Sequence, residues 1–211
     1  MKDKEIRKML IEYLKTQETE MQIYNEKSIS AVICDVLAMT DKLTGYEIKS
    51  DSDNYRRLKR QISCYDYYFD TNYLVVGKTH RSSAMDKVPG YWGIICVEEV
   101  GLTVIREAKA NSSVSAVQQL WLLWRSELKN VLMKNGMPAY NGKGKYFIIN
   151  KIAEKVEETV IKKQSAYELL HRDYSHFNDA DDRSIYINGS LIIDSEHSGK
   201  QQKKQKNDKQ T

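Results

Sequence analysis

The sequence lacks any long apolar run, and this absence limits the class of protein. A helix that spans a bilayer needs about 20 apolar residues in succession, and no such stretch occurs among the 211 residues. Residues 1–15 carry charges throughout and lack the apolar centre of a signal peptide. The composition, 41% hydrophobic and 29% charged, is that of a globular protein. We therefore expect a cytoplasmic protein with no membrane contact and a well-developed core.

Cysteines are few, and phosphate-binding glycine loops are missing. Cys34, Cys64 and Cys96 are widely spaced and odd in number, so they predict neither a disulfide framework nor a metal knuckle. We expect them to be small core residues. Neither a G-x-x-x-x-G-K run nor a G-x-G-x-x-G turn occurs, which argues against a small-molecule enzyme that uses a nucleotide. The formal charge of +4 is compatible with a polyanionic partner but does not identify one.

Hydrophobic periodicity predicts an α/β core in the first half of the chain. Apolar residues at helical spacing alternate with short apolar runs typical of strands. Asp51 and Asp53 precede a helical pattern and are candidate N-caps for it. The order is α-β-β-α-β, with two further strands extending the sheet. The predicted elements are a helix over 2–16, strands over 31–38 and 45–50 paired as a hairpin, a helix over 54–69, and strands over 73–77, 94–97 and 102–105.

The character of the sequence changes after residue 110. Helical spacing predicts helices over 113–134 and 147–172, in which Trp121 and Trp124 stand among leucines and fit helix packing better than base stacking. Asn-Gly between apolar runs predicts a hairpin over 185–193, which caps the helices or pairs with a partner. We divide the chain into a core, a helical appendage with a terminal hairpin, and a disordered Lys- and Gln-rich tail, over residues 1–110, 111–195 and 196–211.

Three residues of the first hairpin have the chemistry of a metal-dependent hydrolase. Glu47 and Lys49 are two apart on one strand, so they share a face about 7 Å apart. Asp35 stands alone in the apolar run of the neighbouring strand. Two carboxylates from adjacent strands make an oxygen site suited to Mg²⁺ or Mn²⁺. A lysine beside them can stabilise an attacking hydroxide.

A simpler interpretation of each residue stays open. A Glu-x-Lys triplet is common on solvated strand edges. Asp35 is more informative, because a carboxylate in an apolar run costs several kcal/mol unless an ionic partner or a metal compensates it. A satisfied buried Asp35 is the alternative to a metal ligand.

The helix over 54–69 adds polar groups suited to phosphate. Gln61 and Tyr65 are four residues apart and share one side of the helix with Arg57. A basic cluster at the start of the helix either follows a nucleic-acid backbone or forms a solvated face. Its members are Arg56, Arg57, Lys59 and Arg60. Glu26, just before the first predicted strand, is either a third metal ligand, brought in by a helix or loop, or a surface residue.

These residues resemble a known family. Asp35, Glu47-Ile-Lys49 and Gln61-x-x-x-Tyr65 are similar to the PD-(D/E)XK, restriction-endonuclease-like superfamily, in its RecB-like branch. The string Glu47-Ile-Lys-Ser-Asp51 also resembles a bacterial and phage family of largely unassigned role, with further likeness over roughly residues 20–170. Gln22 stands where the RecB-like pattern has glycine, and Cys34 where the superfamily's name has proline.

The resemblance implies a restriction-endonuclease-like fold, with a mixed central sheet flanked by helices and a C-terminal helical appendage. It implies that Asp35 and Glu47 bind metal, that Lys49 orients the water, and that Gln61 and Tyr65 position phosphate or water. Glu26 would be a helix-borne acid. We therefore expect a Mg²⁺-dependent nuclease that acts on DNA ahead of RNA. The alternative is a non-catalytic module that binds nucleic acid or protein, with a homodimer or partner contact through the C-terminal region.

Overall fold

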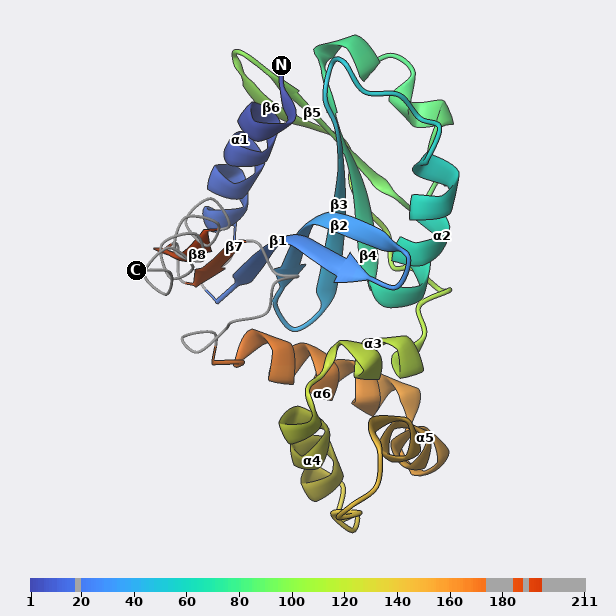
Figure 1. Cartoon of the computed structure of the whole chain (residues 1–211). Helices are drawn as coiled ribbons and strands as arrows, with labels where there is room; N and C mark the ends of the chain where they lie inside the picture. Colours follow the sequence, from blue (N-terminus) through green and yellow to red (C-terminus); the bar gives the residue numbers. More distant parts are fainter. Residues whose placement is uncertain (18–19, 174–183, 188–189, 195–211) are drawn as a thin grey trace, which may run out of the picture.

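The fold is a mixed α/β arrangement around one sheet. The computed structural model describes residues 1–17, 20–173, 184–187 and 190–194. Helix α1 (Asp3–Lys15) covers one face of the sheet, and α2 (Leu58–Tyr68) covers the other (Figure 1). Four further helices lie together below the sheet in that view. Among the described residues, no helix is both long and apolar enough to cross a membrane.

The sheet has the strand order β6-β5-β4-β3-β2-β1-β7-β8. Strands β3, β4 and β5 run parallel, and the other neighbours pair antiparallel. The mixed α/β class is therefore confirmed. The strands are β1 (Gln22–Ile29), β2 (Val32–Met39), β3 (Leu43–Lys49), β4 (Thr71–Gly77), β5 (Gly93–Glu98), β6 (Gly101–Arg106), β7 (Ser184–Ile187) and β8 (Ser190–Asp194).

Strand β1 was not expected from the sequence. It pairs with β2 along its whole length, from Gln22 opposite Met39 to Ile29 opposite Val32. The order of elements is thus α-β-β-β-α-β, one strand more than predicted. The hairpin expected over 185–193 is present as β7 and β8, and it extends the sheet of the same chain: β7 pairs with β1, and β8 forms the edge. The predicted tail over 196–211 lies outside the described residues.

Helix α2 begins at Leu58, four residues later than predicted, and Asp51 and Asp53 do not cap it. Both carboxylates are used at the end of β3. Asp53 accepts from the backbone nitrogen of Ser50 at 2.8 Å, and Asp51 accepts from that of Thr79 at 2.9 Å. The helix then packs directly on β3. A Cβ atom added to Gly45 would lie 2.3 Å from the Phe69 ring, so glycine permits this close approach.

The two long helices predicted after residue 110 are each broken in two. The helices are α3 (Ala116–Leu122), α4 (Arg125–Lys134), α5 (Lys145–Lys155) and α6 (Glu158–Leu170). Leu123 and Trp124 are extended, and the Glu127 carboxylate accepts from the Trp124 backbone nitrogen at 2.6 Å. Val156 and Glu157 are likewise extended. The apolar spacing continues across both breaks, so periodicity alone did not reveal them.

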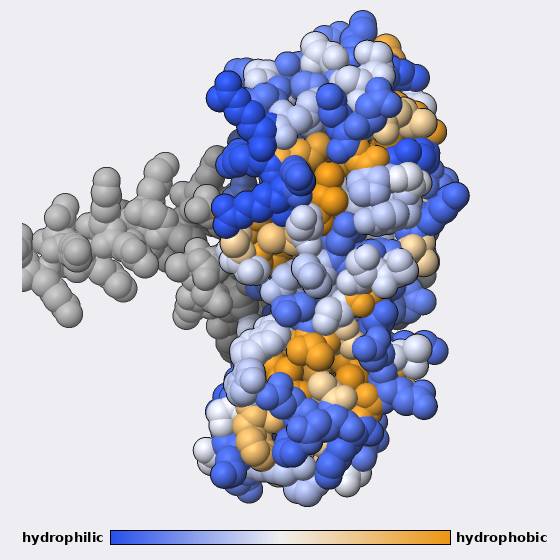
Figure 2. All heavy atoms as spheres, turned by 90° about the vertical axis from the view of Figure 1, so that its right-hand side faces the viewer, coloured by the Kyte–Doolittle hydropathy of each residue, from blue (hydrophilic) through white to orange (hydrophobic). Residues whose placement is uncertain are grey.

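Apolar residues form two clusters, one on each face of the sheet. The smaller joins α1 to the sheet through Ile6, Leu10 and Ile48. The larger lies under α2 and continues without interruption into α3–α6. Figure 2 shows hydrophobic residues in two areas of one side, on the sheet part and on the helices below it, with a more polar band between. Cys34 and Cys96 are buried as expected, and Cys64 is half-buried.

Candidate functional site

The candidate site lies where β2 and β3 separate. The ladder between them extends from Leu43 to Tyr46 on β3, with Tyr46 opposite Val36. One residue beyond, the Asp35 carboxylate takes the place of a strand partner and accepts from the Ile48 backbone nitrogen at 2.8 Å. The Asp35 side chain remains 20% exposed. The end of the ladder therefore fixes this carboxylate while leaving it open to solvent.

Glu47 and Lys49 lie on the α2 side of β3, as their spacing predicts. Both are buried. Lys49 Nζ donates to Glu47 Oε1 at 2.5 Å and to Gln61 Oε1, on α2, at 3.2 Å. The strand and the helix thus hold an acid, a lysine and an amide in one polar group.

A cavity of about 710 Å³ opens over this group, in the size range of ligand sites. Seven of the predicted residues line it, including two basic side chains from the start of α2. They are Glu26, Asp35, Glu47, Lys49, Gln61, Arg57 and Arg60. Arg56 is exposed but does not line the cavity.

Tyr65 lies beneath the cavity rather than in its wall. It is fully buried. Its hydroxyl donates to Glu47 Oε2 at 2.8 Å and accepts from the Asp35 backbone nitrogen at 3.1 Å. Tyr65 therefore holds the two acidic positions relative to each other, and its hydroxyl has no direct access to a bound phosphate.

The placement of Glu26 on a helix is wrong. Glu26 lies on β1, between the pairs Asn25–Val36 and Lys27–Cys34, and so at the level of Asp35 on β2. Its φ of 60° is a left-handed conformation that is uncommon for a non-glycine residue. In the described part of the chain, no three His, Cys, Asp or Glu side chains are close enough to hold a metal together. A three-carboxylate set including Glu26 is therefore not formed.

Arg7 is a site residue that sequence reasoning missed. Its guanidinium lies 3.6 Å from Asp35 Oδ1 and bonds to Asp3 and Asn25. A signal was present, because Arg7 stands beside Ile6, Leu10 and Ile11 on the buried stripe of α1. A cation on an apolar stripe predicts a buried anion opposite it.

The site carries an excess of negative charge. Burial, followed by the charge of Glu47, raises the pKa of Asp35 to about 7, and Arg7 and the Ile48 nitrogen only partly offset these effects. Burial also raises the pKa of Glu47, although Lys49 and Tyr65 act in the opposite direction. Two neighbouring carboxylates that are both hard to ionise form a site that an added cation would stabilise. Mg²⁺ needs only one or two protein carboxylates besides water and substrate phosphate, so Asp35 and Glu47 fit it.

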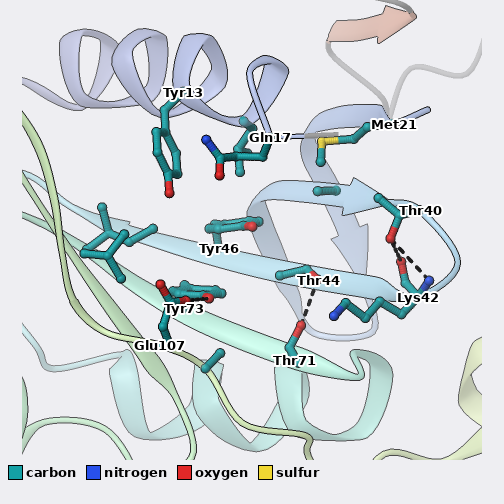
Figure 3. Close-up of a pocket in the computed structure, with 15 residues that line it drawn as sticks. Tyr13, Gln17, Met21, Thr40, Lys42, Thr44, Tyr46, Thr71, Tyr73 and Glu107 are labelled. Atoms are coloured by element: carbon teal, nitrogen blue, oxygen red, sulfur yellow. Dashed lines mark hydrogen bonds between the residues drawn. The ribbon is translucent and has the colours of Figure 1, made fainter. Parts of the chain in front are cut away.

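A second, smaller cavity of about 220 Å³ lies on the α1 face of the sheet. Figure 3 shows Tyr46 and Tyr73 stacked on its floor, with Tyr13 of α1 turned toward them. Its polar groups are largely matched to one another. Tyr73 donates to Glu107 at 2.7 Å, and the Thr44 and Thr71 hydroxyls are 2.8 Å apart. This cavity is lined by one carboxylate, Glu107, and not by a pair of acids like Asp35 and Glu47.

Comparisons with known proteins identify one relative and one family. Protein cII of Enterobacteria phage P4 is 25% identical over 149 residues, which cover 67% of this chain and 56% of that protein. The chain thus spans about half the length of this relative. The SPO1766 protein of unknown function from Silicibacter pomeroyi is similar in structure at a TM-score of 0.40 and 12% identity, over 54% of this chain and 72% of that one. The family model of bacteriophage P4 protein cII matches residues 1–188, and the chain belongs to this family.

Proposed function

We propose that this protein is a metal-dependent nuclease of the PD-(D/E)XK type, which hydrolyses phosphodiester bonds in DNA ahead of RNA. One observation carries the proposal. Asp35 and Glu47, both with a raised pKa, line one cavity with Lys49 and Gln61. A bound cation would stabilise the ionised form of both acids. The mixed sheet flanked by helices is compatible with a restriction-endonuclease-like core.

The residues of the chain divide the work in this proposal. Asp35 and Glu47 would hold Mg²⁺ or Mn²⁺, which supplies Lewis-acid polarisation of the phosphate and makes a water more acidic. Lys49 stabilises the attacking hydroxide through its positive charge, and Gln61 orients Lys49. Arg57 and Arg60 face the same cavity and suit the flanking phosphates.

Other residues position the two acidic side chains of the site. Tyr65 positions Glu47 by a hydrogen bond of 2.8 Å. Arg7 positions Asp35 from α1, and Asp3 holds the guanidinium of Arg7 at 3.0 Å. Tyr65 and Arg7 are positioning residues, since they reach the reacting phosphate only through Glu47 or Asp35, whereas Asp3 also lines the cavity.

A second candidate is a non-catalytic module that binds nucleic acid. The observation that favours it is the 2.5 Å contact between Lys49 and Glu47, in which the lysine already neutralises a would-be metal ligand. In that case the cavity and its arginines would bind a phosphate without cleaving it.

The test compares purified wild-type protein with Asp35→Ala and Lys49→Ala. Substrates are linear, circular and single-stranded DNA and RNA, each with Mg²⁺, Mn²⁺ or EDTA. Lys42→Ala is the matched control, because Lys42 is an exposed lysine on the turn between β2 and β3. We expect wild type and Lys42→Ala to cleave with metal only, and the two site variants to lose at least about a hundredfold in rate.

Two outcomes would reject the nuclease. One is cleavage of no substrate by wild type whose circular dichroism shows a folded protein, which would leave the binding module. The other is cleavage that persists in Asp35→Ala and Lys49→Ala, which would indicate a contaminating enzyme.

A further inference from the structure

Large aromatic side chains stand exposed on the helices below the sheet. Trp121 and Trp124 are each 37% exposed and Tyr146 is 67% exposed. Leu120 and Leu123, beside the tryptophans in sequence, are fully buried. The prediction that the two tryptophans belong to the core is therefore wrong: the leucines fill the core, and the indoles lie at the corner between α3 and α4.

The Trp121 and Tyr146 rings lie near each other, and a cation packs on each of the two tryptophans. The Trp121 and Tyr146 ring centroids are 6.4 Å apart. Lys145 Nζ lies 5.4 Å from the centre of the Trp121 ring and donates to the Trp121 carbonyl at 2.7 Å. The Arg172 guanidinium packs 4.1 Å from the Trp124 ring centre. The rings are thus held in place before any ligand arrives, which reduces the entropy cost of binding one.

Further cations lie between these helices and the β1–β2 hairpin, which lines the larger cavity. Tyr24 on β1 links the two, since Lys27 lies 5.1 Å over its ring and Arg172 lies 3.3 Å from its hydroxyl. Burial, followed by the charge of Arg172, lowers the pKa of Lys145; Glu127 acts in the opposite direction, and Lys27 adds a smaller lowering effect. Lys27 is the residue after Glu26, which lines the cavity. Because Glu127 neutralises Arg172, the positive charge between the tryptophans and β1 comes from Lys145 and Lys27.

We propose that this surface binds single-stranded nucleic acid and leads it into the cavity; the direction of the strand rests on the nuclease proposed above. We define the aromatic–basic surface as Trp121, Trp124, Tyr146, Lys27 and Lys145. Exposed rings stack on bases of any sequence, and neighbouring lysines follow the phosphates. A duplex offers these rings no free base faces except at its ends, so a single strand is the better ligand.

The test measures binding without cleavage. Fluorescence anisotropy in EDTA follows a mixed-sequence, dye-labelled single-stranded DNA and the corresponding duplex. We expect the wild type to prefer the single strand, and Trp121→Ala/Tyr146→Ala to bind it at least tenfold more weakly. Trp121→Phe/Tyr146→Phe retains aromatic rings and should bind within about threefold of wild type. Tyr67→Ala is the control, since Tyr67 is a 58% exposed tyrosine on α2, outside the aromatic–basic surface.

Tryptophan fluorescence gives a second measurement. Of the three tryptophans, Trp92 is fully buried, so quenching by unlabelled single-stranded DNA must come from Trp121 or Trp124. We expect the quenching to be roughly halved in Trp121→Phe, which removes one of the two responding indoles but still binds.

The outcomes separate this inference from the nuclease. Equal binding of duplex and single strand, or single-strand binding unchanged in Trp121→Ala/Tyr146→Ala, overturns the inference even if the protein cleaves DNA. Binding that depends on the rings, in a protein that cleaves nothing, supports the surface and rejects the nuclease. Failure of the wild type to bind single strands would also overturn it.

Discussion

Two buried ion pairs in this molecule differ in how completely their charges are matched. Arg172 meets both carboxylate oxygens of Glu127 at 2.6 Å, bonds the Leu122 carbonyl and packs on the Trp124 ring. Lys49 meets one oxygen of Glu47. A second carboxylate, Asp35, lies near Glu47, and the charge of Glu47 helps to raise the pKa of Asp35.

The difference indicates what each pair does. The Arg172 pair satisfies donors and acceptors around one another, as a structural contact requires. It fastens the chain just beyond α6 to α4. The Lys49 pair leaves a second carboxylate, Asp35, beside Glu47 in the cavity, and in the function proposed above a cation would offset this charge. Stability measurements on matched variants can therefore distinguish the two.

The largest effect on stability should come from Arg172→Met. It leaves the buried Glu127 carboxylate without its cation, and we expect a loss of about 3–5 kcal/mol in the free energy of unfolding. Urea denaturation measures it. The matched double variant Arg172→Met/Glu127→Gln removes both charges but keeps an acceptor for the Trp124 nitrogen, so it should recover most of the loss. A loss below about 1 kcal/mol in the single variant would show that the Arg172 pair is not the structural contact described here.

Whether a helix or strand could be predicted from the sequence depends on what its residues contact. Apolar spacing located α1 and β2 to β6 because each buries one face or both. Strand β1 was missed because Asn25, Glu26 and Lys27 interrupt its apolar pattern, and its pairing with β2 supplies the stability that its composition does not. The break between α3 and α4 contains no glycine or proline, and only the capping contact of Glu127 marks it.

The part of the candidate geometry that follows most directly from the sequence is the pair of residues on one strand. Glu47 and Lys49 follow from alternation alone. The distance from Asp35 to Arg7 follows from how α1 packs across the sheet, which no local pattern contains. Tyr65 was identified as a partner of Gln61, yet its depth beneath Glu47 depends on the close packing of α2 at Gly45. Local spacing thus predicted which side chains share a face, and it did not predict the contacts that depend on packing between elements.

A smaller effect, and one that depends on pH, should follow from Lys49→Met. It removes the cation from Glu47, whose pKa burial already raises. Because the folded state can then take up a proton that the unfolded state has released, unfolding free energy falls as pH increases. We expect a loss of about 1–3 kcal/mol at pH 8 and less at pH 5.5. Urea denaturation at both values measures the loss. Equal losses at both values would show that Glu47 does not accept the proton.

The smallest effect should be a gain. The pKa of Asp35 is about 7 in the folded protein, against 3.8 for the unconstrained group. A carboxyl whose folded pKa is raised supports the fold below the unfolded value and loses that support as pH rises through the folded value. Asparagine cannot ionise and keeps an acceptor for the Ile48 nitrogen. Asp35→Asn should therefore be more stable than wild type at pH 8 by on the order of 1 kcal/mol, or about 2–4 °C in Tm.

Thermal unfolding at pH 5 and pH 8 measures this gain, with Asp41→Asn as the matched exposed control on the turn between β2 and β3. At pH 5 the difference should shrink, because wild-type Asp35 then holds its proton. Mg²⁺ added at pH 8 should raise the Tm of wild type and leave Asp35→Asn nearly unchanged, since a bound cation relieves the repulsion that the substitution has already removed. A substitution that instead lowers the Tm at pH 8 would mean that the contact with Arg7 outweighs the repulsion from Glu47. The site would then be a matched ion pair like that of Arg172, with no excess charge left to bind a metal.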